Sequence, residues 1–518
     1  MKRFLFFTFL FFLGTVIACS SKKSAKAFHT VLYGEIEYLD PTLSSDENSR
    51  EVIINLFEGL LELHPKTLEP RPALAKKFEV SDDGLTYTFY LRDDAKWSNG
   101  DAVTANDFVY SWRRAVDPKT AAKYAYYLYH LKNGEAINTG KISDLTQLGV
   151  SAISPTILKA ELEHPLPFFP YLVSWTTFLP VHQKTVETYD KEWAQPGHIV
   201  TNGPFLLKEW KPYDQILLEA NPNYWDRKHV HLTQAVFHVI EEAETALKLF
   251  QEGTLHFMHR VPDLKIKTLK SQPEFVDGPL LGTYFVMFNV NTPQLKDKRV
   301  RQAFVMAIDR QKIVDVIQKG MASASFVPES IAGYIPAKGL EFNPEKARAQ
   351  LAEAGFADPK KFPETTLVYN TSDEHKMAMQ LIQNMWKENL GIEVKLYNME
   401  MKSLLKEWRV GNFQISRRGW IGDYPDPTTF LDLFRPGFGN NFSGWNHQGY
   451  EELLREATKT RNASKRFQLL RKAESILLDE SPALPIYTYT HPHLISAKVT
   501  GIYHNAMNQH PLKGVTLD

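Results

Sequence analysis

The chain has almost no cysteine. Its 518 residues include a single one, Cys19, so no internal disulfide can form, and the chain beyond that position offers no thiol nucleophile or cysteine-ligated metal site. An excess of charge of either sign is also missing, because 60 Lys and Arg residues match 60 Asp and Glu residues. A balanced charge creates no overall field that would attract nucleic acid. We therefore expect no nucleic-acid partner.

Motifs of common enzymes are missing as well. The sequence has no Gly-x-Ser-x-Gly, no His-Glu-x-x-His and no P-loop. Two close histidine pairs, His229/His231 and His491/His493, would need further converging ligands to hold a metal. We expect no metal, no cofactor and no enzymatic activity. A secreted lipoprotein hydrolase, with a site assembled from distant residues, is the alternative.

Only the N-terminus carries a long apolar run. Lys2 and Arg3 precede the run at 4–13, and Val-Ile-Ala-Cys follows at 16–19. This pattern predicts a secretory signal at 1–18 rather than a membrane-spanning anchor. Val-Ile-Ala-Cys resembles the bacterial lipobox, in which cleavage before the cysteine is coupled to lipid attachment. The resemblance implies that Cys19 carries lipid, that 19–27 is a flexible tether, and that the protein is anchored to a bacterial membrane in the periplasm or at the cell surface.

Strand and helix signals alternate along the rest of the chain. Period-two alternation at 85–91 predicts a strand, and Thr104 begins a predicted helix that runs to about Val116. In the later half, predicted strands at 366–370 and 392–397 flank an amphipathic helix that ends at Gly391. Strand–helix–strand at this length indicates a parallel βαβ unit in an α/β protein. Ligands of such sheets bind beyond the carboxyl ends of the strands, which directs attention to residues 371–375 and to 419–427, after a predicted strand at 412–416.

Several motifs in a fixed order make the chain recognisable. Its most specific stretch covers residues 72–118, PALAKKFEVSDDGLTYTFYLRDDAKWSNGDAVTANDFVYSWRRAVDP. The chain resembles the oligopeptide-binding proteins of bacterial ABC importers, in the peptide/nickel group of solute-binding proteins. The other matching motifs are Leu-Asp-Pro at 39–41, Asn-Gly-Pro-Phe at 202–205, Asn-Pro-Asn-Tyr-Trp at 221–225, Val-Arg-Gln-Ala-Phe at 300–304, Ala-Ile-Asp-Arg at 307–310, Val-Tyr-Asn-Thr-Ser at 368–372 and Gly-Trp-Ile-Gly-Asp at 419–423.

The resemblance implies an α/β periplasmic-binding-protein fold with two lobes, an additional domain and a ligand cleft between the lobes. We expect a discontinuous lobe I at 28–48, 172–283 and 488–518, an additional domain II at 49–171 and lobe III at 284–487. The implied partners are short peptides and the membrane permease subunits of an ABC importer, and a monomer is expected. A cell-wall (murein) peptide is the alternative ligand on the same scaffold.

A cleft that removes both ends of a peptide from water must supply a charge opposite to each. The resemblance implies that Asp423 pairs with the peptide ammonium, and Asp426 is the second candidate; either could instead cap a turn. For the carboxylate end it implies Arg417 and His375, whose alternatives are a surface ion pair and a solvated helix start.

Four further positions match the family less specifically. Glu35 matches a cleft glutamate, and Tyr110, Trp420 and Tyr284 match cleft aromatics, for which core packing is the alternative. Two positions depart from the family's pattern: Met401 replaces a tryptophan, and Trp408 stands near the place of an arginine. These departures affect the expected fine specificity of the cleft.

Overall fold

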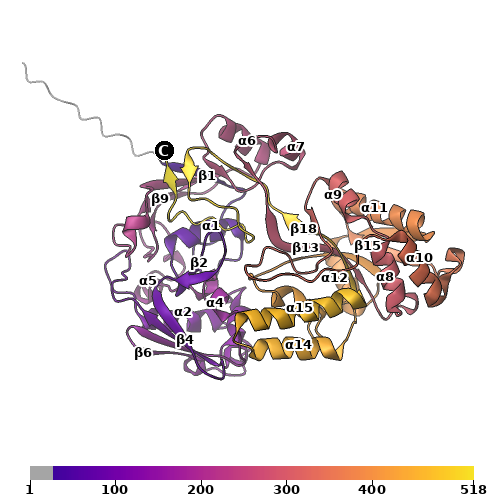
Figure 1. Cartoon of the computed structure of the whole chain (residues 1–518). Helices are drawn as coiled ribbons and strands as arrows, with labels where there is room; N and C mark the ends of the chain where they lie inside the picture. The colour runs from indigo at the N-terminus through magenta and orange to yellow at the C-terminus, as the bar shows by residue number, and fades with distance from the viewer. Residues whose placement is uncertain (1–26) are drawn as a thin grey trace, which may run out of the picture.

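The computed structural model describes residues 27–518, so the predicted signal peptide, Cys19 and all of the predicted tether except residue 27 lie outside the described residues. The described chain forms two lobes, each built around its own mixed sheet (Figure 1). Figure 1 shows the indigo, purple and pink segments gathered in one lobe with the yellow C-terminal end, while the orange segments form the other. The predicted two-lobed α/β fold is therefore confirmed.

The first lobe contains a seven-stranded sheet in the order β12-β19-β11-β1-β10-β9-β8. The central strand β1 pairs in parallel with β10 and β11, and the outer pairs are antiparallel. Its strands come from the beginning, middle and end of the described chain: β1 Phe28–Leu32, β8 Phe205–Lys211, β9 Gln215–Ala220, β10 Gln234–Val239, β11 Phe257–Met258, β12 Phe275–Val276 and β19 His493–Ile495. Helices α6 (Ala243–Gln251) and α7 (Ile266–Leu269) contribute to a small core against this sheet.

A four-stranded antiparallel sheet, β4-β5-β7-β6, packs with the first lobe. The predicted strand at 85–91 is present as β5, and the helix predicted from Thr104 is present as α2, with Thr104 and Asp107 forming its capping box. This region comprises β2 Leu61–Leu63, β3 Pro70–Pro72, β4 Ala75–Val80, β5 Thr86–Leu91, β6 Val150–Ser154, β7 Ile157–Glu161, α1 Glu47–Leu56, α2 Ala105–Val116, α3 Gly134–Asn138, α4 Phe169–Leu172 and α5 Gln183–Tyr189.

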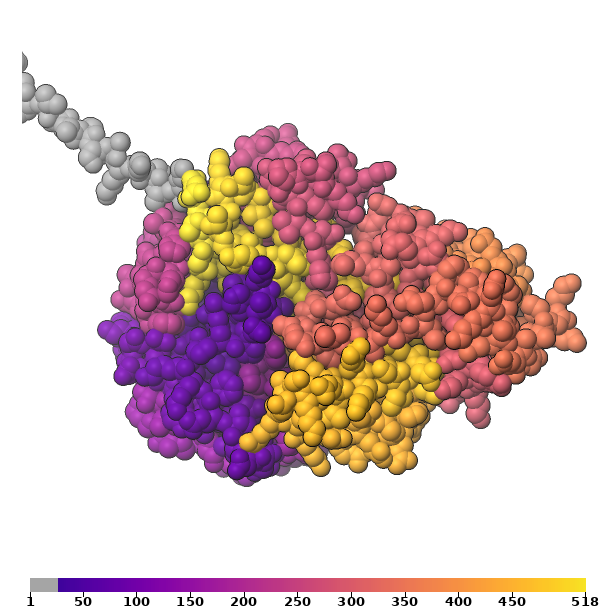
Figure 2. Space-filling model, viewed as in Figure 1, coloured from indigo at the N-terminus to yellow at the C-terminus, as the bar shows by residue number. Residues whose placement is uncertain are grey.

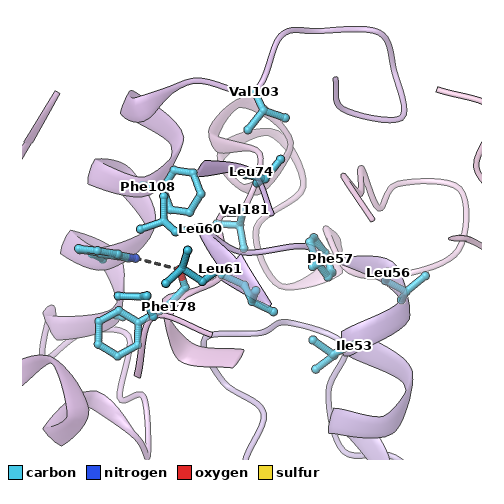
Figure 3. Packing of buried hydrophobic residues seen from close by; sticks show 14 of the residues in the cluster. Ile53, Leu56, Phe57, Leu60, Leu61, Leu74, Val103, Phe108, Phe178 and Val181 are labelled. Atoms are coloured by element: carbon cyan, nitrogen blue, oxygen red, sulfur yellow. Dashed lines mark hydrogen bonds between the residues drawn. The ribbon is translucent and has the colours of Figure 1, made fainter. Parts of the chain in front are cut away.

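One hydrophobic core joins this region to the seven-stranded sheet. Residues of β1, β9 and β10 belong to the same buried cluster as residues of α1, α2 and β5. Figure 3 shows part of the cluster, where Ile53, Leu56 and Phe57 from α1 and its end lie near Leu60 and Leu61. Because so much apolar surface is shared, we expect these two sheets to move as one body.

The second lobe contains a six-stranded sheet in the order β14-β18-β13-β17-β15-β16. The predicted parallel βαβ unit is confirmed: β15 pairs in parallel with β16, and α11 connects them. The strands are β13 Pro279–Phe288, β14 Met321–Ala322, β15 Thr365–Asn370, β16 Val394–Met399, β17 Ile415–Ile421 and β18 Ala483–Thr490. The helices are α8 Lys298–Met306, α9 Arg310–Ile317, α10 Pro344–Leu351, α11 Asp373–Leu390, α12 Met401–Val410, α13 Thr428–Leu431, α14 Gln448–Lys459 and α15 Ala463–Glu480.

Two separate cores pack with this sheet. One core includes α8, α9, α10 and α11, and the other includes α12, α13, α14 and α15. Strand β17 is longer than the predicted strand at 412–416, because it pairs with β13 as far as Ile421. Gly419 and Trp420 therefore lie inside a strand and not in the loop that follows it.

The chain crosses between the lobes at two adjacent places. Strand β12 ends at Val276 and β13 begins at Pro279, while β18 ends at Thr490 and β19 begins at His493. The backbone N–H of His491 donates to the carbonyl of Gly278 at 3.1 Å, which ties the two crossings together. The predicted lobe boundaries at 283/284 and 487/488 fall inside β13 and β18, and the division into three domains stays a prediction.

Over residues 27–518, no helix is both long enough and apolar enough to cross a membrane.

Buried histidines surround the crossing. His493 is completely buried, its ring lies 5.5 Å from that of His504 and 5.6 Å from that of His510, and its Nδ1 lies 3.2 Å from the carbonyl of His491. Burial lowers the pKa of His493 to about 3 and that of His259 to about 4, and it lowers the pKa of His510 well below the usual 6.5. These rings are neutral in the folded protein at neutral pH.

The histidines predict how stability depends on pH. Their folded-state pKa values lie below the unfolded value, so their contribution is fully present above about pH 6.5 and is lost as the pH falls toward the folded values. Each such histidine lowers the free energy of unfolding by about 1.4 kcal/mol per pH unit on acidification, because the unfolded chain binds one more proton. For three of them, acidification from pH 6 to pH 5 should lower the free energy of unfolding by roughly 3–4 kcal/mol. Urea unfolding across this range measures the slope. His510→Gln should make the slope shallower, while the exposed His231→Gln should not; equal slopes in all three proteins would contradict the assignment.

Candidate functional site between the lobes

A cavity of about 390 Å³ lies where the two lobes meet, next to the crossing strands. It is lined from both lobes. The first lobe and its packed domain contribute the start of α1, the segment before η1 (Ala125–His130) and the segment near Trp175, and the second lobe contributes the end of β17. Its lining residues are Ser44, Ser45, Asp46, Glu47, Arg50, Tyr124, Trp175, Thr176, Leu280, Ile421, Gly422, Asp423, His491, Ala506, Met507 and Asn508.

Asp423 enters this cavity from the tight turn that ends β17. The backbone N–H of Gly422 donates to the carbonyl of Leu281 at 2.7 Å. A Cβ on Gly422 would lie 2.9 Å from side-chain atoms of Leu281 and Thr429, so only glycine fits this turn without displacing them. The turn therefore delivers the carboxylate that follows it to the boundary between the lobes.

The Asp423 carboxylate has no cationic partner among the described residues. Burial raises its pKa, and the nearby Tyr127 hydroxyl lowers it only in part. The Tyr127 hydroxyl is itself buried and forms no hydrogen bond of normal geometry within residues 27–518. A half-buried carboxylate without a fixed counter-charge is costly, and a cationic ligand would remove that cost.

Aromatic rings from the first lobe's side surround this carboxylate. The rings of Tyr124 and Tyr127 stack at 5.6 Å, and Trp175 meets Tyr127 edge-on at 5.7 Å. The sequence analysis did not single out these three residues. The density of tyrosines in the segment YAYYLY at 124–129 could have drawn attention to Tyr124 and Tyr127, whereas no local pattern marks Trp175.

Arg50 is a further cavity residue that the sequence analysis missed. It lies on α1, its guanidinium is 5.3 Å from the centre of the Trp175 ring, and its Nε is buried without a hydrogen-bond partner in the described chain. Asp46, in the same cavity, caps α1 by accepting from the N–H of Ser49 at 2.8 Å. Helix periodicity indicates that α1 has a buried face, but it cannot show that the first turn borders a cleft.

Asp426, the second candidate for the ammonium, is already paired. Both its oxygens accept from Arg466, at 2.6 and 2.8 Å, and both side chains are buried. It also accepts from the Thr428 hydroxyl at 2.7 Å. Burial alone would raise the pKa of Asp426, but Arg466 and Thr428 lower it. Asp426 therefore holds its loop to α15 and is not available to a ligand.

Three of the predicted residues come together at the carboxyl end of β15. Arg417 donates to Asn370 at 3.1 Å and to the Tyr489 hydroxyl at 2.9 Å, and its guanidinium lies 4.4 Å from the centre of the Tyr284 ring. The Tyr284 hydroxyl lies 3.3 Å from Nδ1 of His375. No carboxylate of the described residues pairs with Arg417, and its Nε has no hydrogen-bond partner there.

His375 cannot supply charge at neutral pH. Burial, with Arg417 nearby, lowers its pKa to about 4. It can still donate one hydrogen bond, as a neutral ring does. Of the two residues predicted for the peptide carboxylate, only Arg417 is therefore charged at neutral pH, and it is held between Asn370 and two tyrosines.

The structure places four predicted residues outside this arrangement, and none of them lines the cavity that holds Asp423. Trp420 packs on the opposite face of β17 from Arg417, because side chains alternate along a strand, and its Nε1 donates to Thr429 at 3.4 Å. Glu35 accepts from Trp210 at 3.0 Å and from the backbone of Tyr213. Tyr110 is half-buried on α2, where burial raises its pKa. Met401 is 41% exposed at the start of α12.

The departure at Trp408 also has a structural explanation. Its ring is buried against the sheet, and Nε1 donates to the Ser416 hydroxyl at 2.7 Å. Arg418 lies 5.4 Å from the ring and points away from Arg417, as alternation along β17 requires. Trp408 thus belongs to the core. The two histidine pairs of the sequence are not part of a group of possible metal ligands. Within residues 27–518, no three His, Cys, Asp or Glu side chains are grouped in that way.

The sequence matches the family described as bacterial extracellular solute-binding proteins, family 5, over residues 69–442. The chain belongs to this family. A curated relative, the oligopeptide-binding protein OppA of Bacillus subtilis, is 37% identical over 479 residues, which cover 90% of this chain and 88% of the relative. The relatives are solute-binding proteins, and the resemblance inferred from the motifs is thereby confirmed.

Solved structures also show which arrangement of the lobes this solute-binding protein has. The periplasmic murein tripeptide-binding protein MppA, in its unliganded open form, is 33% identical, covers 95% of this chain and 98% of its own, and superposes with a TM-score of 0.90. Another structure of MppA, from Escherichia coli, has the same identity and covers 95% and 99%, but its TM-score is 0.71. At the same identity and nearly the same coverage, the unliganded open form superposes better. The structure is therefore similar to the open form.

The two aspartates of the loop should respond differently to loss of charge. Asp426→Asn breaks a buried ion pair and leaves Arg466 uncompensated, so it should lower the free energy of unfolding by about 3–5 kcal/mol. Asp423→Asn removes a carboxylate whose pKa is raised by burial, so the ligand-free protein should be unchanged or slightly more stable at pH 7. Urea unfolding without ligand measures both. A large loss of stability in Asp423→Asn would show that its charge has a partner in the folded protein.

Proposed function

We propose that this protein captures short peptides outside the cytoplasm and delivers them to an ABC importer. The observation that carries the proposal is Asp423, a partly buried carboxylate without a cationic partner in residues 27–518, in a cavity lined by both lobes. The free amino terminus of a peptide supplies the missing charge. In this function the protein binds without turnover, needs no cofactor or metal and acts as a monomer.

Arg417 supplies the opposite charge for the peptide carboxylate. It precedes Asp423 by six residues along β17 and the turn after it, so their Cα atoms are separated by roughly 20 Å or less. An extended peptide spans about 3.3–3.6 Å per residue, so the two side chains suit ligands of a few residues. Neutral His375, next to Arg417, adds a hydrogen-bond donor for the same carboxylate.

A murein peptide is the alternative ligand, because it also carries an amino terminus and carboxylates. The named relatives include an oligopeptide-binding and a murein tripeptide-binding protein. Since Asp423 and Arg417 recognise charged ends, they serve either ligand. Titration with both kinds of peptide separates the two.

The peptide proposal predicts a coupling between one side chain and one ligand group. The wild-type protein should bind a free peptide far more tightly than its amino-terminally acetylated form, because acetylation removes the ammonium. Asp423→Asn should lose about 2–5 kcal/mol of binding free energy with the free peptide, roughly 30- to several-thousand-fold in affinity. The variant should discriminate much less between the two peptides. Isothermal titration calorimetry measures all four affinities.

Two results would contradict this proposal. If the wild-type protein binds neither free oligopeptides nor murein peptides, the ligand class is wrong. If acetylation weakens binding equally in the wild-type protein and in Asp423→Asn, then Asp423 does not bind the ammonium. Asp426→Asn is unsuitable as a control because it breaks the pair with Arg466, whereas Glu35→Gln, outside the cavity, should leave the discrimination unchanged.

Membrane attachment through Cys19 is part of the same proposal. The lipobox-like Val-Ile-Ala-Cys at 16–19 and the polar tether that follows support it. Stable anchoring needs more than one acyl chain, so multiple acylation is implied. Cys19→Ser should therefore move the protein from the membrane fraction to the soluble or unprocessed fraction after cell fractionation. A variant that is processed and sediments with membranes like the wild type would contradict lipid attachment.

A further inference from the structure

One aromatic ring of the second lobe packs against the core of the first lobe's body. Tyr424 directly follows Asp423, and its ring stacks on Phe168 with centroids 4.2 Å apart and planes 7° apart. Phe168 is buried just before α4, and Tyr424 packs against the hydrophobic cluster that contains it. The ring thus bridges the two lobes in the open arrangement.

The loop that carries Tyr424 is fixed on its own lobe. Gly422 is bonded to Leu281, the N–H of Asp426 donates to the carbonyl of Tyr424 at 2.8 Å, and Asp426 is paired with Arg466 on α15. Asp423 is therefore held on one side by this braced turn and on the other by the ring that follows it. A change in the stack would be transmitted directly to the direction of the Asp423 side chain.

Other contacts between the lobes lie along the same boundary. Leu68, from the β2–β3 hairpin, is buried in a core of the second lobe, and the N–H of Leu281 donates to the carbonyl of Ala506 at 2.7 Å. Exposed Asp82 pairs with Arg461, after α14, at 3.2 Å. Figure 2 shows the indigo segments of the first lobe in surface contact with the golden α14–α15 region. Contacts that are already packed in the open form lie near the axis about which one lobe rotates against the other, so they are displaced least when the lobes close.

We propose that the Tyr424–Phe168 stack positions Asp423 at the pivot of lobe closure, so that the open form already binds the peptide ammonium and closure then completes the site around the carboxylate end. This inference rests on the proposed function. Tyr424 and Phe168 are positioning residues: they act through Asp423 and need no contact with the peptide. Arg417 lies near the start of β17, away from the loop that follows the strand, and belongs to the part of the site that closure completes.

The physical argument is one of pre-organisation. An ammonium binds most tightly to a carboxylate that already points at it, because the binding free energy is then not reduced by ordering that side chain. A stacked aromatic pair contributes about as much as a three- to tenfold change in affinity. Without the stack, Asp423 would sample more directions, and only ligands that use its charge would be affected.

The experiment compares Tyr424→Leu, Phe168→Leu and the double variant with the wild-type protein, using one peptide in free and in acetylated form. Each leucine variant should bind the free peptide roughly three- to tenfold more weakly, with a smaller loss for the acetylated peptide. The double variant should be no worse than the single ones, because both remove the same contact. Tyr424→Phe should bind like the wild type, since the ring is kept. Tyr397→Leu, at a half-exposed tyrosine on β16, is the matched control and should have no effect.

Several outcomes would overturn the inference. An equal loss for the free and acetylated peptides would mean that the stack merely supports the fold, and unchanged affinities would mean that it has no role. Circular dichroism melting shows whether each variant folds; if a leucine variant does not, Tyr424→Met and Phe168→Met remove the rings but keep a flexible apolar chain that adapts to the gap. If the wild-type protein distinguishes the two peptides but the variants do so equally well, this inference fails and the proposed function stands. If the wild-type protein binds no peptide, both fail.

Discussion

The structure depends on one electrostatic constraint: a charge that a cleft removes from water must meet an opposite charge. Asp423 and Arg417 are both shielded from solvent, and neither has a partner of opposite sign among the described residues. In an open cleft, water at the boundary offsets part of the cost; in a closed one it cannot. A closed but empty cleft would therefore be unfavourable, while a ligand with an ammonium and a carboxylate would make the closed form favourable. In the proposed function, the same two side chains would thus determine both the class of ligand and the state of the lobes.

The architecture suits this coupling because the lobes are linked in a limited way. The first sheet and the four-stranded sheet share one large core, so they form one body, whereas the second lobe has two cores that belong mainly to itself. The chain crosses between them beside Gly278 and His491, where a backbone hydrogen bond joins the crossings. Room at this place is restricted, since a Cβ on Gly278 would lie 2.5 Å from the His504 ring. A narrow, tightly packed crossing permits rotation of whole lobes and resists other distortions.

The sequence predicted some parts of the site better than others for physical reasons. The α/β class and the βαβ unit follow from the alternation of strand and helix signals. Arg417, His375 and Tyr284 were named only because their motifs resemble the family, and they meet because β13, β17 and β15 are neighbours in one sheet. Trp420, expected in the cleft, lies on the face of β17 opposite Arg417, because β17 continues to Ile421. Glu35 and Tyr110 lie near motifs in the sequence but point into other parts of the first lobe. Arg50 and Trp175 could not be found, because tertiary packing brings them to the cavity and no local pattern marks them. The tyrosine-rich segment at 124–129 is visible in the sequence, but its place beside the cavity is not.

The two aspartates after β17 show why spacing alone cannot assign a role. Asp423 and Asp426 are three residues apart, the first is half-buried and the second buried, and by sequence both could serve as an ammonium ligand or as a turn residue. What separates them is the nearest cation: Arg466 reaches Asp426 with two hydrogen bonds, and no described cation reaches Asp423. The pair between Asp426 and Arg466 fixes the loop to α15. Because the loop is rigid, the unpaired Asp423 is already oriented at the boundary between the lobes before a ligand binds. A loop that had to be ordered by the ligand would lose binding free energy to that ordering, so the structural aspartate is a condition for the function proposed for its neighbour.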